Sequence, residues 1–379
     1  MQRLMVVIHG LGGGGSERVL LNILKGLDKK EFFITLVMYE RAFVFDAPQH
    51  VEIEILDIQS SKNLFKFTAN FFLKVIRLAN LMKKKEPSII FSFLSSTNVT
   101  VILSKILSRI KCRLMVSEHI PPSIALAQGL YNYVVKCLMR YLYPCSNRII
   151  AVSEGIKRDL VENFGVDEKN VCVIYNPFDL DEIERLSREE EITTFFQDNK
   201  PAVVAVGRLS PEKNHTLLLR SFCEVRKSND LKLMFIGEGE EKERLIELSK
   251  KLKIDKEVFF IGFQKNPYKY MSKATMLVLP SLYEGFGNVI VEAMALGLPV
   301  IATDCPYGPS EIIEDGKDGF LAPSDDPVAL AIKMKEVLQD HELRANISKA
   351  AKIKAQRFKL DNIIGQYRRM LLEDTASSL

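Results

Sequence analysis

The sequence predicts an α/β protein made of two Rossmann-like domains, whose parallel sheets face each other across a cleft. A length of 379 residues suits two domains of ordinary size better than one core. Short β-branched runs alternate with helical patterns along the chain, which is typical of right-handed βαβ units and parallel sheets. This alternation breaks once, around Asn176-Pro177, and then restarts.

The first half supplies the elements of one such domain. One helix is predicted over residues 17–27, because its apolar residues recur at helical spacing. The predicted strands cover residues 4–8, 32–38, 53–58, 89–93, 114–117, 149–152 and 171–174.

The second half repeats the alternation after a charged stretch, residues 179–200, which we interpret as an inter-domain connector. We therefore expect domains at 1–176 and 177–358, with a C-terminal helix at 359–379 packing back on the first domain. Ligands of open parallel sheets bind at the carboxyl ends of the strands, so the cleft is the expected active site. The predicted strands here cover residues 202–206, 231–236, 258–261, 276–279, 300–303 and 319–321.

Composition excludes several classes of protein. With 47% hydrophobic and 26% charged residues, the chain is neither disordered nor fibrous, and its net charge of +4 is modest. The six cysteines form no C-x-x-C pair, so we expect reduced thiols in a cytoplasmic protein and no zinc site. The apolar run at 4–8 is shorter than a signal peptide core, and no membrane-spanning segment is expected.

A glycine-rich loop follows the first strand. Residues 9–17 read His-Gly-Leu-Gly-Gly-Gly-Gly-Ser-Glu and lead into a helix, whose free N–H groups can hold an anion. As a dinucleotide fingerprint the loop fails, because only Glu40 loosely matches the acidic residue required after the second strand. A plain tight turn and an anion-binding loop both remain open for this segment.

Two cations follow a strand of the second half. Arg208 and Lys213 lie in Gly-Arg-Leu-Ser-Pro-Glu-Lys-Asn, directly after residues 202–206. Negative charge grows on a nucleotide diphosphate as it leaves a sugar, and two fixed cations can stabilise that charge. The alternative is a pair of solvated surface cations.

A second glycine-rich turn carries two carboxylates. A strand ends near Pro280, and a helix is predicted to start near Gly287-Asn288, where its N-terminus can hold a diphosphate. Glu284 lies in the turn and is expected to face the sugar. Glu292 lies about two turns along the helix and can accept two hydrogen bonds from a ribose diol. Solvated helix glutamates are the alternative.

These motifs together resemble the retaining family 4 glycosyltransferases of the GT-B fold, over essentially the whole chain. Glu284 and Glu292 match the family's Glu-x7-Glu element. The other matching motifs are Gly207-Arg208 with Lys213, Gly14-Gly15-Ser16-Glu17, Gly308-Pro309-Ser310-Glu311, Asp315-Gly316 and Asp318-Gly319-Phe320-Leu321. Ser16 stands where the family often carries alanine, which changes little.

The resemblance implies a metal-independent transfer from a UDP-linked sugar, with no cofactor, an acceptor-binding first domain and a donor-binding second domain. Arg208 and Lys213 then bind the diphosphate, Glu284 the sugar hydroxyls and Glu292 the ribose. His119, in Ser117-Glu118-His119, looks like the family's active-site histidine. The implied catalytic residues are Glu284, His119, Arg208 and Lys213. The implied donor-binding residues are Gly14, Gly15, Gly207, Arg208, Lys213, Glu284, Gly285, Phe286, Gly287, Asn288 and Glu292.

One motif of a different transferase fold is present in form only. Asp179-Leu180-Asp181 spells D-x-D, a metal-binding signature elsewhere. It follows no strand, so we predict that Asp179 starts a helix and that the chain has no metal site.

Residues 64–85 predict a basic amphipathic helix. Lys66, Lys74 and Arg77 are interleaved with aromatic and aliphatic residues, and such a helix can lie on an anionic bilayer or bind a lipid pyrophosphate. An ordinary helix covering the sheet explains the apolar face equally well. Residues 120–143 are a second apolar and aromatic stretch that can add to a membrane-facing surface.

Within the family, residues 91–98, 117–119 and 266–271 look most like bacterial enzymes that extend undecaprenyl-diphosphate-linked oligosaccharides. The resemblance implies transfer of a hexose or N-acetylhexosamine, for example N-acetylgalactosamine, in lipopolysaccharide or capsule assembly. It also implies a peripheral position at the cytoplasmic face of the inner membrane and no nucleic-acid partner. A soluble or different lipid acceptor, a nucleotide-sugar epimerase, and a non-catalytic nucleotide-sugar-binding or scaffold protein are the alternatives.

Overall fold

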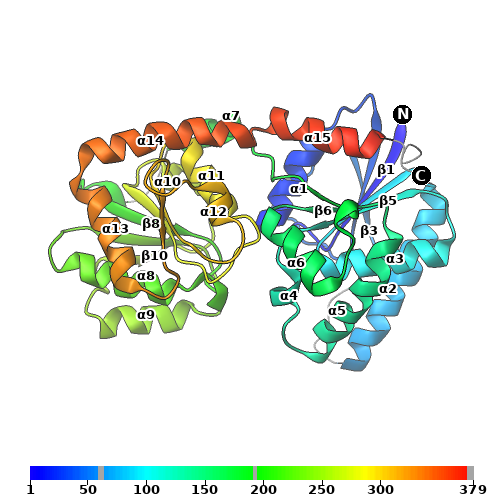
Figure 1. Ribbon diagram of the computed structural model, residues 1–379, viewed down its shortest axis with the longest axis horizontal. Helices are drawn as coiled ribbons and strands as arrows, with labels where there is room; N and C mark the ends of the chain where they lie inside the picture. The colour runs from blue at the N-terminus through cyan, green and yellow to red at the C-terminus, as the bar shows by residue number, and fades with distance from the viewer. Residues whose placement is uncertain (59–63, 191–193, 374–379) are drawn as a thin grey trace. The chain divides into compact units, whose positions relative to one another are not determined.

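The computed structural model describes residues 1–58, 64–190 and 194–373, without the side chains of residues 64–67 and 194. The chain divides into two compact units (Figure 1). Unit 1 comprises Met1–Pro177 with Leu360–Leu379, and unit 2 comprises Phe178–Lys359. Each division lies one residue from the expected boundary. The C-terminal helix α15 (Leu360–Leu372) groups with the first unit and packs against helix α1 (Gly15–Gly26).

Unit 1 is built on a parallel sheet. Its described strands have the order β3-β2-β1-β4-β5-β6-β7, and every neighbouring pair is parallel. Their bounds are Val51–Ile55, Phe32–Met38, Gln2–Ile8, Ile89–Phe93, Arg113–Glu118, Arg148–Ala151 and Val171–Val173. The central strand β4 is buried along its whole length, which explains why its sequence is apolar and not alternating.

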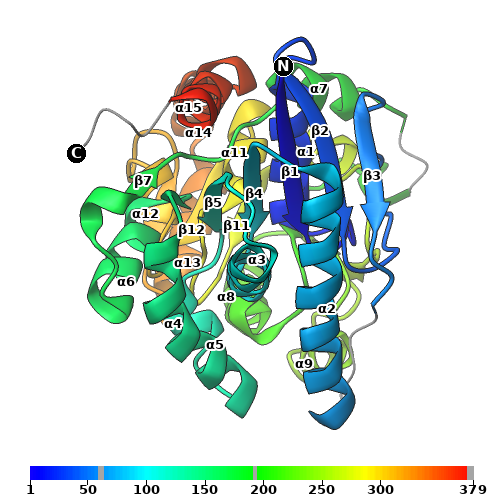
Figure 2. The same cartoon turned by 90° about the vertical axis from the view of Figure 1, so that its right-hand side faces the viewer.

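The helices of unit 1 cover this sheet. Beside α1 and α15 they are α2 (Leu64–Lys85), α3 (Ser95–Ser108), α4 (Pro122–Ala125), α5 (Leu130–Leu142) and α6 (Glu154–Phe164). Figure 2 shows α3 between α2 and α5, and α3 packs against both. Helix α15 completes the core with Ile363, Tyr367 and Leu371, which are spaced by four residues and fully buried.

Unit 2 repeats the plan with a parallel sheet whose described strands have the order β10-β9-β8-β11-β12-β13. The strands are Val258–Phe260, Lys232–Ile236, Ala202–Val206, Met276–Leu279, Val300–Thr303 and Phe320–Ala322. The helices are α7 (Leu180–Ser187), α8 (His215–Arg226), α9 (Lys242–Lys251), α10 (Tyr268–Met271), α11 (Asn288–Ala295), α12 (Pro309–Ile312), α13 (Pro327–Gln339) and α14 (His341–Ala355). The predicted pair of Rossmann-like parallel sheets is confirmed.

The expected inter-domain connector is wrong in part. Residues 180–187 form helix α7, which packs against α10 and α11 of unit 2 and buries Leu180 and Ile183. Asp179 caps this helix, because its Oδ1 accepts a hydrogen bond of 3.0 Å from the Glu182 N–H. The segment is therefore part of unit 2, and the D-x-D pattern is a helix start as predicted.

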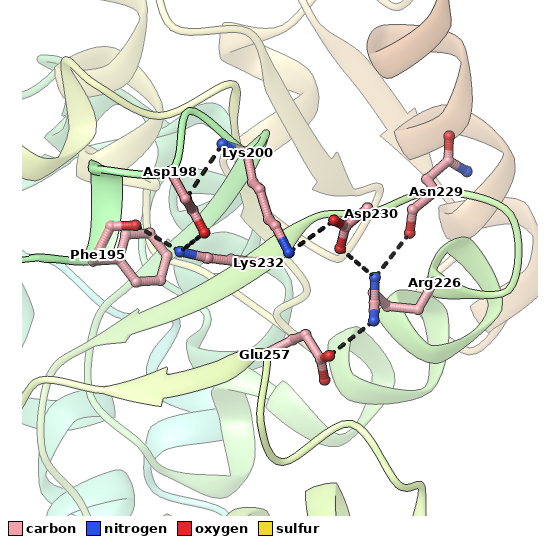
Figure 3. Close-up of polar contacts among 8 residues, drawn as sticks. All are labelled: Phe195, Asp198, Lys200, Arg226, Asn229, Asp230, Lys232 and Glu257. Atoms are coloured by element: carbon pink, nitrogen blue, oxygen red, sulfur yellow. Dashed lines mark hydrogen bonds and ion pairs between the residues drawn. The ribbon is translucent and has the colours of Figure 1, made fainter.

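Ion pairs lie at the amino edge of the sheet of unit 2 (Figure 3). Lys232, the first residue of β9, pairs with Asp198 at 2.5 Å and also donates to the Phe195 carbonyl oxygen. Arg226, at the end of α8, bridges Asp230 and Glu257, both at 2.8 Å. These contacts satisfy the charges at this edge, whereas Arg208, Lys213 and Glu284 follow the carboxyl ends of β8 and β11.

Candidate active site

The second unit gathers its motifs where three neighbouring strands end. Strand β8 leads into residues 207–214, here called the cation loop, and strand β11 leads into residues 280–287, here called the glycine turn. Because β8 and β11 are paired, the two segments leave the sheet side by side. The Leu282 N–H donates to the Glu212 carbonyl oxygen at 2.8 Å, and Thr303 of β12 donates to the Ser281 carbonyl oxygen at 2.5 Å.

Lys213 and Glu284 meet in this place. The Lys213 Nζ lies 2.5 Å from the Glu284 Oε1, and these side chains are 22% and 10% exposed. The Ser281 hydroxyl donates to the same Oε1 at 2.7 Å. The sequence prediction that these two residues share a site is therefore met in the geometry, and the carboxylate holds the ammonium group in place.

Arg208 lies at the start of the cation loop with its side chain exposed. Its carbonyl oxygen is 3.2 Å from the Nε2 of His215, a buried residue at the start of α8. A carbonyl oxygen only accepts hydrogen bonds, so the His215 Nε2 carries the proton. Burial lowers the pKa of His215 to about 4, which keeps the ring neutral.

Two glycines that sequence reasoning missed support the cation loop from behind. Gly237 and Gly239 follow strand β9, and a Cβ atom on them would lie 1.8 Å from the Gly207 carbonyl oxygen and 2.2 Å from the Leu209 carbonyl oxygen, respectively. The loop also donates a hydrogen bond to this segment, from the Leu209 N–H to the Glu238 carbonyl oxygen at 2.9 Å. The signal was present as Gly-Glu-Gly directly after a strand, a place where glycine permits close backbone approach.

Helix α11 begins at Asn288, as predicted, after Gly287 in a left-handed conformation at φ 96°. Glu292 is its fifth residue, little more than one turn along the helix, where the sequence predicted about two. Glu292 is buried, and the Tyr268 hydroxyl donates to its Oε1 at 3.2 Å. Tyr268, from the short helix α10, lies in the segment 266–271 noted in the sequence, but it was not predicted to be a site residue.

The remaining predicted residues of the glycine turn are buried. Gly285 and Gly287 are buried, and the Phe286 ring packs inward near Phe178 and Phe358, at 6.4 and 5.5 Å between ring centroids. Any contact of Phe286 with a ligand is therefore made by its backbone and not by its ring.

In the glycine-rich loop of unit 1, a carboxylate of the chain itself accepts the hydrogen bonds of the loop N–H groups. The Glu17 Oε2 accepts hydrogen bonds from the Gly13 N–H at 2.5 Å and from the Gly14 N–H at 2.9 Å. The expectation that Gly14 presents an open N–H to a phosphate is therefore wrong for the structure as it stands. Gly15 is the first residue of α1 and also makes further polar contacts.

His119 lies directly after strand β5, as predicted, and is buried. Its ring stacks on Phe93 at 5.1 Å, and its Nε2 lies 2.9 Å from the Ser117 hydroxyl. The Nδ1 atom is buried and finds no hydrogen-bond partner among the described residues. Burial lowers the pKa of His119 to about 3, so the ring is neutral.

The neighbouring Glu118 is a fully buried carboxylate that the sequence reasoning did not weigh. Burial raises the pKa of Glu118 to about 7, while hydrogen bonds from Tyr143, Ser95 and Asn98 act in the opposite direction. These partners come from other elements, 20 to 25 residues away in the sequence.

The three cations assigned to the acceptor or membrane differ in their surroundings. Lys74 turns inward, with its Nζ 4.9 Å above the ring of Tyr39 at the end of β2, and burial lowers its pKa. Arg77 donates to the Leu56 carbonyl oxygen at 2.8 Å. The side chain of Lys66 lies outside the described residues. Lys74 therefore reaches the carboxyl edge of the sheet, while no membrane role of Arg77 is visible.

The arrangement suits the handling of a negatively charged leaving group. One edge of unit 2 combines an exposed guanidinium, a fixed ammonium and the N-terminus of α11, which all favour bound anions. Two carboxylates with restricted orientation, Glu284 and Glu292, can accept hydrogen bonds from hydroxyl groups.

Among the described helices, none is long and apolar enough to span a bilayer.

Family models match both halves of the chain. The model described as Glycosyltransferase Family 4 matches residues 13–182, and the model described as Glycosyl transferases group 1 matches residues 187–354.

Named relatives match over nearly the full length. The N-acetylgalactosamine-N,N'-diacetylbacillosaminyl-diphospho-undecaprenol 4-alpha-N-acetylgalactosaminyltransferase of Campylobacter jejuni is 32% identical, covering 94% of this chain and 96% of its own. A second C. jejuni enzyme, GalNAc-alpha-(1->4)-GalNAc-alpha-(1->3)-diNAcBac-PP-undecaprenol alpha-1,4-N-acetyl-D-galactosaminyltransferase, is 26% identical over 98% of this chain and 99% of its own. The crystal structure of Anabaena Alr3699/HepE in complex with UDP and glucose matches with a TM-score of 0.80 at 22% identity, over 100% of both chains, which bears on the fold alone.

Proposed function

The chain belongs to the family 4 glycosyltransferases of the GT-B fold, and from this premise we propose that it moves a sugar from a UDP-linked donor to a polyprenyl-diphosphate-linked oligosaccharide. The donor sugar is a hexose or an N-acetylhexosamine, and its anomeric configuration is retained. The observation that carries the proposal is the contact of Lys213 with Glu284 beside the N-terminus of α11.

The chemistry is a same-face displacement. The bond between the anomeric carbon and the diphosphate oxygen breaks, and a bond from the acceptor oxygen to that carbon forms on the same face. The acceptor proton passes to an oxygen of the leaving diphosphate, so no side chain serves as nucleophile. Arg208, Lys213 and the first N–H groups of α11 stabilise the charge that develops on this group without a metal ion.

The two carboxylates hold the donor. Glu284 fixes Lys213 through Oε1 and binds a sugar hydroxyl through its other oxygen, and Glu292 binds the ribose diol. His119 donates or accepts a hydrogen bond through its unpartnered Nδ1, either toward the donor sugar or toward the acceptor. A buried polar atom without a partner costs free energy, which a bound hydroxyl group would recover.

The acceptor proposal starts from the relatives that act on undecaprenol-linked sugars and from the surface of unit 1. Helices α2 and α5 contain no acidic residue, and both pack against α3 (Figure 2). They leave large apolar side chains exposed, among them Phe72 and Ile76 on α2 and Leu130 and Tyr133 on α5. We assign these faces to peripheral contact with an anionic bilayer at the cytoplasmic face of the inner membrane, and Lys74 to the acceptor diphosphate.

One experiment tests the activity. UDP release from a panel of nucleotide sugars is measured with a short-chain polyprenyl-diphosphate sugar, with the matching free sugar and with no acceptor, and the products are identified by mass spectrometry and NMR. We expect release only with the lipid-linked acceptor, and an axial linkage when the donor is α-linked. Efficient use of the free sugar would reject the lipid acceptor, and turnover of the donor without any acceptor would favour an epimerase. Lys213→Ala should lower kcat at least ~100-fold, the loss expected when a charge-stabilising group is removed.

The membrane contact has a matched pair of variants. Ile76→Ser on α2 should weaken binding to anionic liposomes by about tenfold, because its side chain would otherwise enter the interface. Ile332→Ser, on α13 of unit 2, removes an isoleucine that is 50% exposed, against 49% for Ile76, and should bind like the wild type. Equal binding by all three proteins would remove α2 from the membrane contact.

A further inference from the structure

A buried polar cluster in unit 1 has no part in the chemistry so far described. Glu118, the last residue of β5, is completely buried. Its Oε2 accepts a hydrogen bond from the Ser95 hydroxyl at 2.8 Å, and its Oε1 accepts from the Asn98 amide at 2.9 Å and from the Tyr143 hydroxyl. Every partner donates, so the site is built for a carboxylate and not for an amide.

The cluster ties β5 to its neighbours. The Asn98 amide also donates to the Ser117 carbonyl oxygen at 3.0 Å, and the Ser92 hydroxyl donates to the Asn98 Oδ1 at 2.7 Å. The Leu94 N–H, before α3, donates to the same Ser117 carbonyl oxygen at 3.0 Å. Leu94 has φ 74°, a conformation that costs a branched residue free energy and persists only where the surroundings impose it.

A second buried carboxylate holds the other end of the segment that follows β5. Asp159 of α6 is 1% exposed, and its Oδ2 accepts a 3.0 Å hydrogen bond from the Ser123 N–H. Its Oδ1 accepts from the Asn163 amide at 2.8 Å. Residues 118–123 are thus fixed at their start by Glu118 and at their end by Asp159, and His119 lies between these points.

We propose that Glu118 and Asp159 are positioning residues for the transfer reaction, which fix the segment 118–123 so that the His119 Nδ1 faces the bound sugars. The inference rests on the proposed function, in which His119 contacts the donor or the acceptor. The two carboxylates touch neither substrate. They act only through His119, whose ring is held by Phe93 and Ser117 as described above.

Removing either carboxylate should therefore slow the reaction more than it weakens donor binding. In Glu118→Gln the new NH₂ group cannot accept a hydrogen bond, so at least one of the three hydrogen bonds to this side chain is reversed or lost, and we expect the segment to move. A displacement of about 1 Å at a catalytic group costs up to ~100-fold in rate. We expect Glu118→Gln and Asp159→Asn to lower kcat by ~10- to 100-fold, with the KM for the nucleotide sugar nearly unchanged.

The test is a pair of double-mutant cycles on the full chain. Glu118→Gln and Asp159→Asn are each measured alone and combined with His119→Ala, together with thermal unfolding of every variant. If the carboxylates act through His119, each should reduce kcat by less than ~3-fold in the His119→Ala background, since the interaction they serve is already gone. Leu371→Ala, which loses core packing of the same unit, should unfold at lower temperature and keep its kcat below that temperature.

The outcomes distinguish a failure of the positioning role from a failure of the proposed function. A His119→Ala variant with normal kcat would reject the role of His119 in the proposed function. The positioning role would be rejected if His119→Ala is slow and Glu118→Gln and Asp159→Asn each lower its kcat by the same factor as in the wild type. The proposed function would then still stand. If Glu118→Gln does not fold, Ser95→Ala removes one of the three donors and should give a ~3- to 10-fold loss that again vanishes without His119.

Discussion

The substitution Gly239→Ala tests whether the Gly237–Gly239 segment sets the position of the cation loop. Gly239 is not in the left-handed region, so alanine is allowed by the backbone itself. What forbids it is the cation loop, because the added Cβ would lie 2.2 Å from the carbonyl oxygen, 2.5 Å from the carbonyl carbon and 2.7 Å from the nitrogen of Leu209.

The size of the effect follows from these distances. Ordinary contact between a Cβ and a carbonyl oxygen begins near 3.4 Å, so the two segments must separate by about 1.2 Å. Leu209 is flanked by Arg208 and lies four residues before Lys213. Two backbone hydrogen bonds of 2.9 Å tie it to the turn after β9: the Leu209 N–H donates to the Glu238 carbonyl oxygen, and the Glu241 N–H donates to the Leu209 carbonyl oxygen. Misplacing a charge-stabilising group by about 1 Å costs up to ~100-fold in kcat/KM, equivalent to about 2.7 kcal/mol.

Initial rates of UDP release over a range of donor concentrations give kcat and KM, and thermal unfolding gives stability. The matched control is Gly365→Ala in helix α15, where the added Cβ meets nothing within 4 Å. This control should be fully active and slightly more stable, by up to about 1 kcal/mol, because alanine favours the helix. Normal kinetics of Gly239→Ala would show that displacing the loop does not matter and that Arg208 and Lys213 do not bind the diphosphate.

Three further predictions concern single residues. The pKa of His215 is about 4 in the folded protein and near 6.5 in the unfolded chain, so the unfolded chain binds more protons between these values and stability falls as the pH falls through that window. Between pH 7.5 and 4.5, the free energy of unfolding in urea should fall by about 2–3 kcal/mol more for the wild type than for His215→Asn. Equal losses would contradict the neutral buried ring. Tyr268→Phe should raise the KM for the nucleotide sugar by roughly tenfold, because it loses the hydrogen bond to Glu292. The control Tyr270→Phe should leave the KM unchanged, because the Tyr270 hydroxyl donates to Gln264. Equal KM values for the two variants would remove Tyr268 from the site. Asp179→Ala should cost about 1 kcal/mol of stability by removing the α7 cap, with unchanged activity; a loss of activity that added metal restored would revive the metal-binding interpretation of D-x-D.

The fold was predictable because the central strands of its sheets are buried on both faces and are therefore continuous apolar runs. Five strands, Phe32–Met38, Ile89–Phe93, Ala202–Val206, Met276–Leu279 and Val300–Thr303, have the predicted bounds. Strand β3 does not: it covers Val51–Ile55 and not 53–58, because Asp57 turns into the left-handed region at φ 51° and ends the extended chain, although Ile58 is buried. The start of helix α7 at Asp179 was predicted, but its extent was not, since only two of its residues, Leu180 and Ile183, are buried, too few to mark an amphipathic pattern.

The candidate site was predictable only where chemistry follows a strand end in the sequence. Lys213 and Glu284 were expected in the same site, since both follow strands in recognisable motifs, but they were assigned to the diphosphate and to the sugar, and their ion pair was not predicted. The partners of Glu118 were not, because they converge from α3 and from the segment after α5, and no local pattern links them. The Glu17 carboxylate at the glycine-rich loop was likewise hidden, because sequence alone does not show which way a side chain turns.

The assignment of helix α15 to unit 1 also bears on how the chain is made. Unit 2 is one uninterrupted stretch, whereas unit 1 is assembled from two stretches separated by the whole of unit 2. Tyr367 and Leu371 fill its interior, so during synthesis the first half must wait with an incomplete interior until residues 360–372 have left the ribosome. Unit 2 can by then be folded, and the order of folding is the reverse of the order in which the two halves begin.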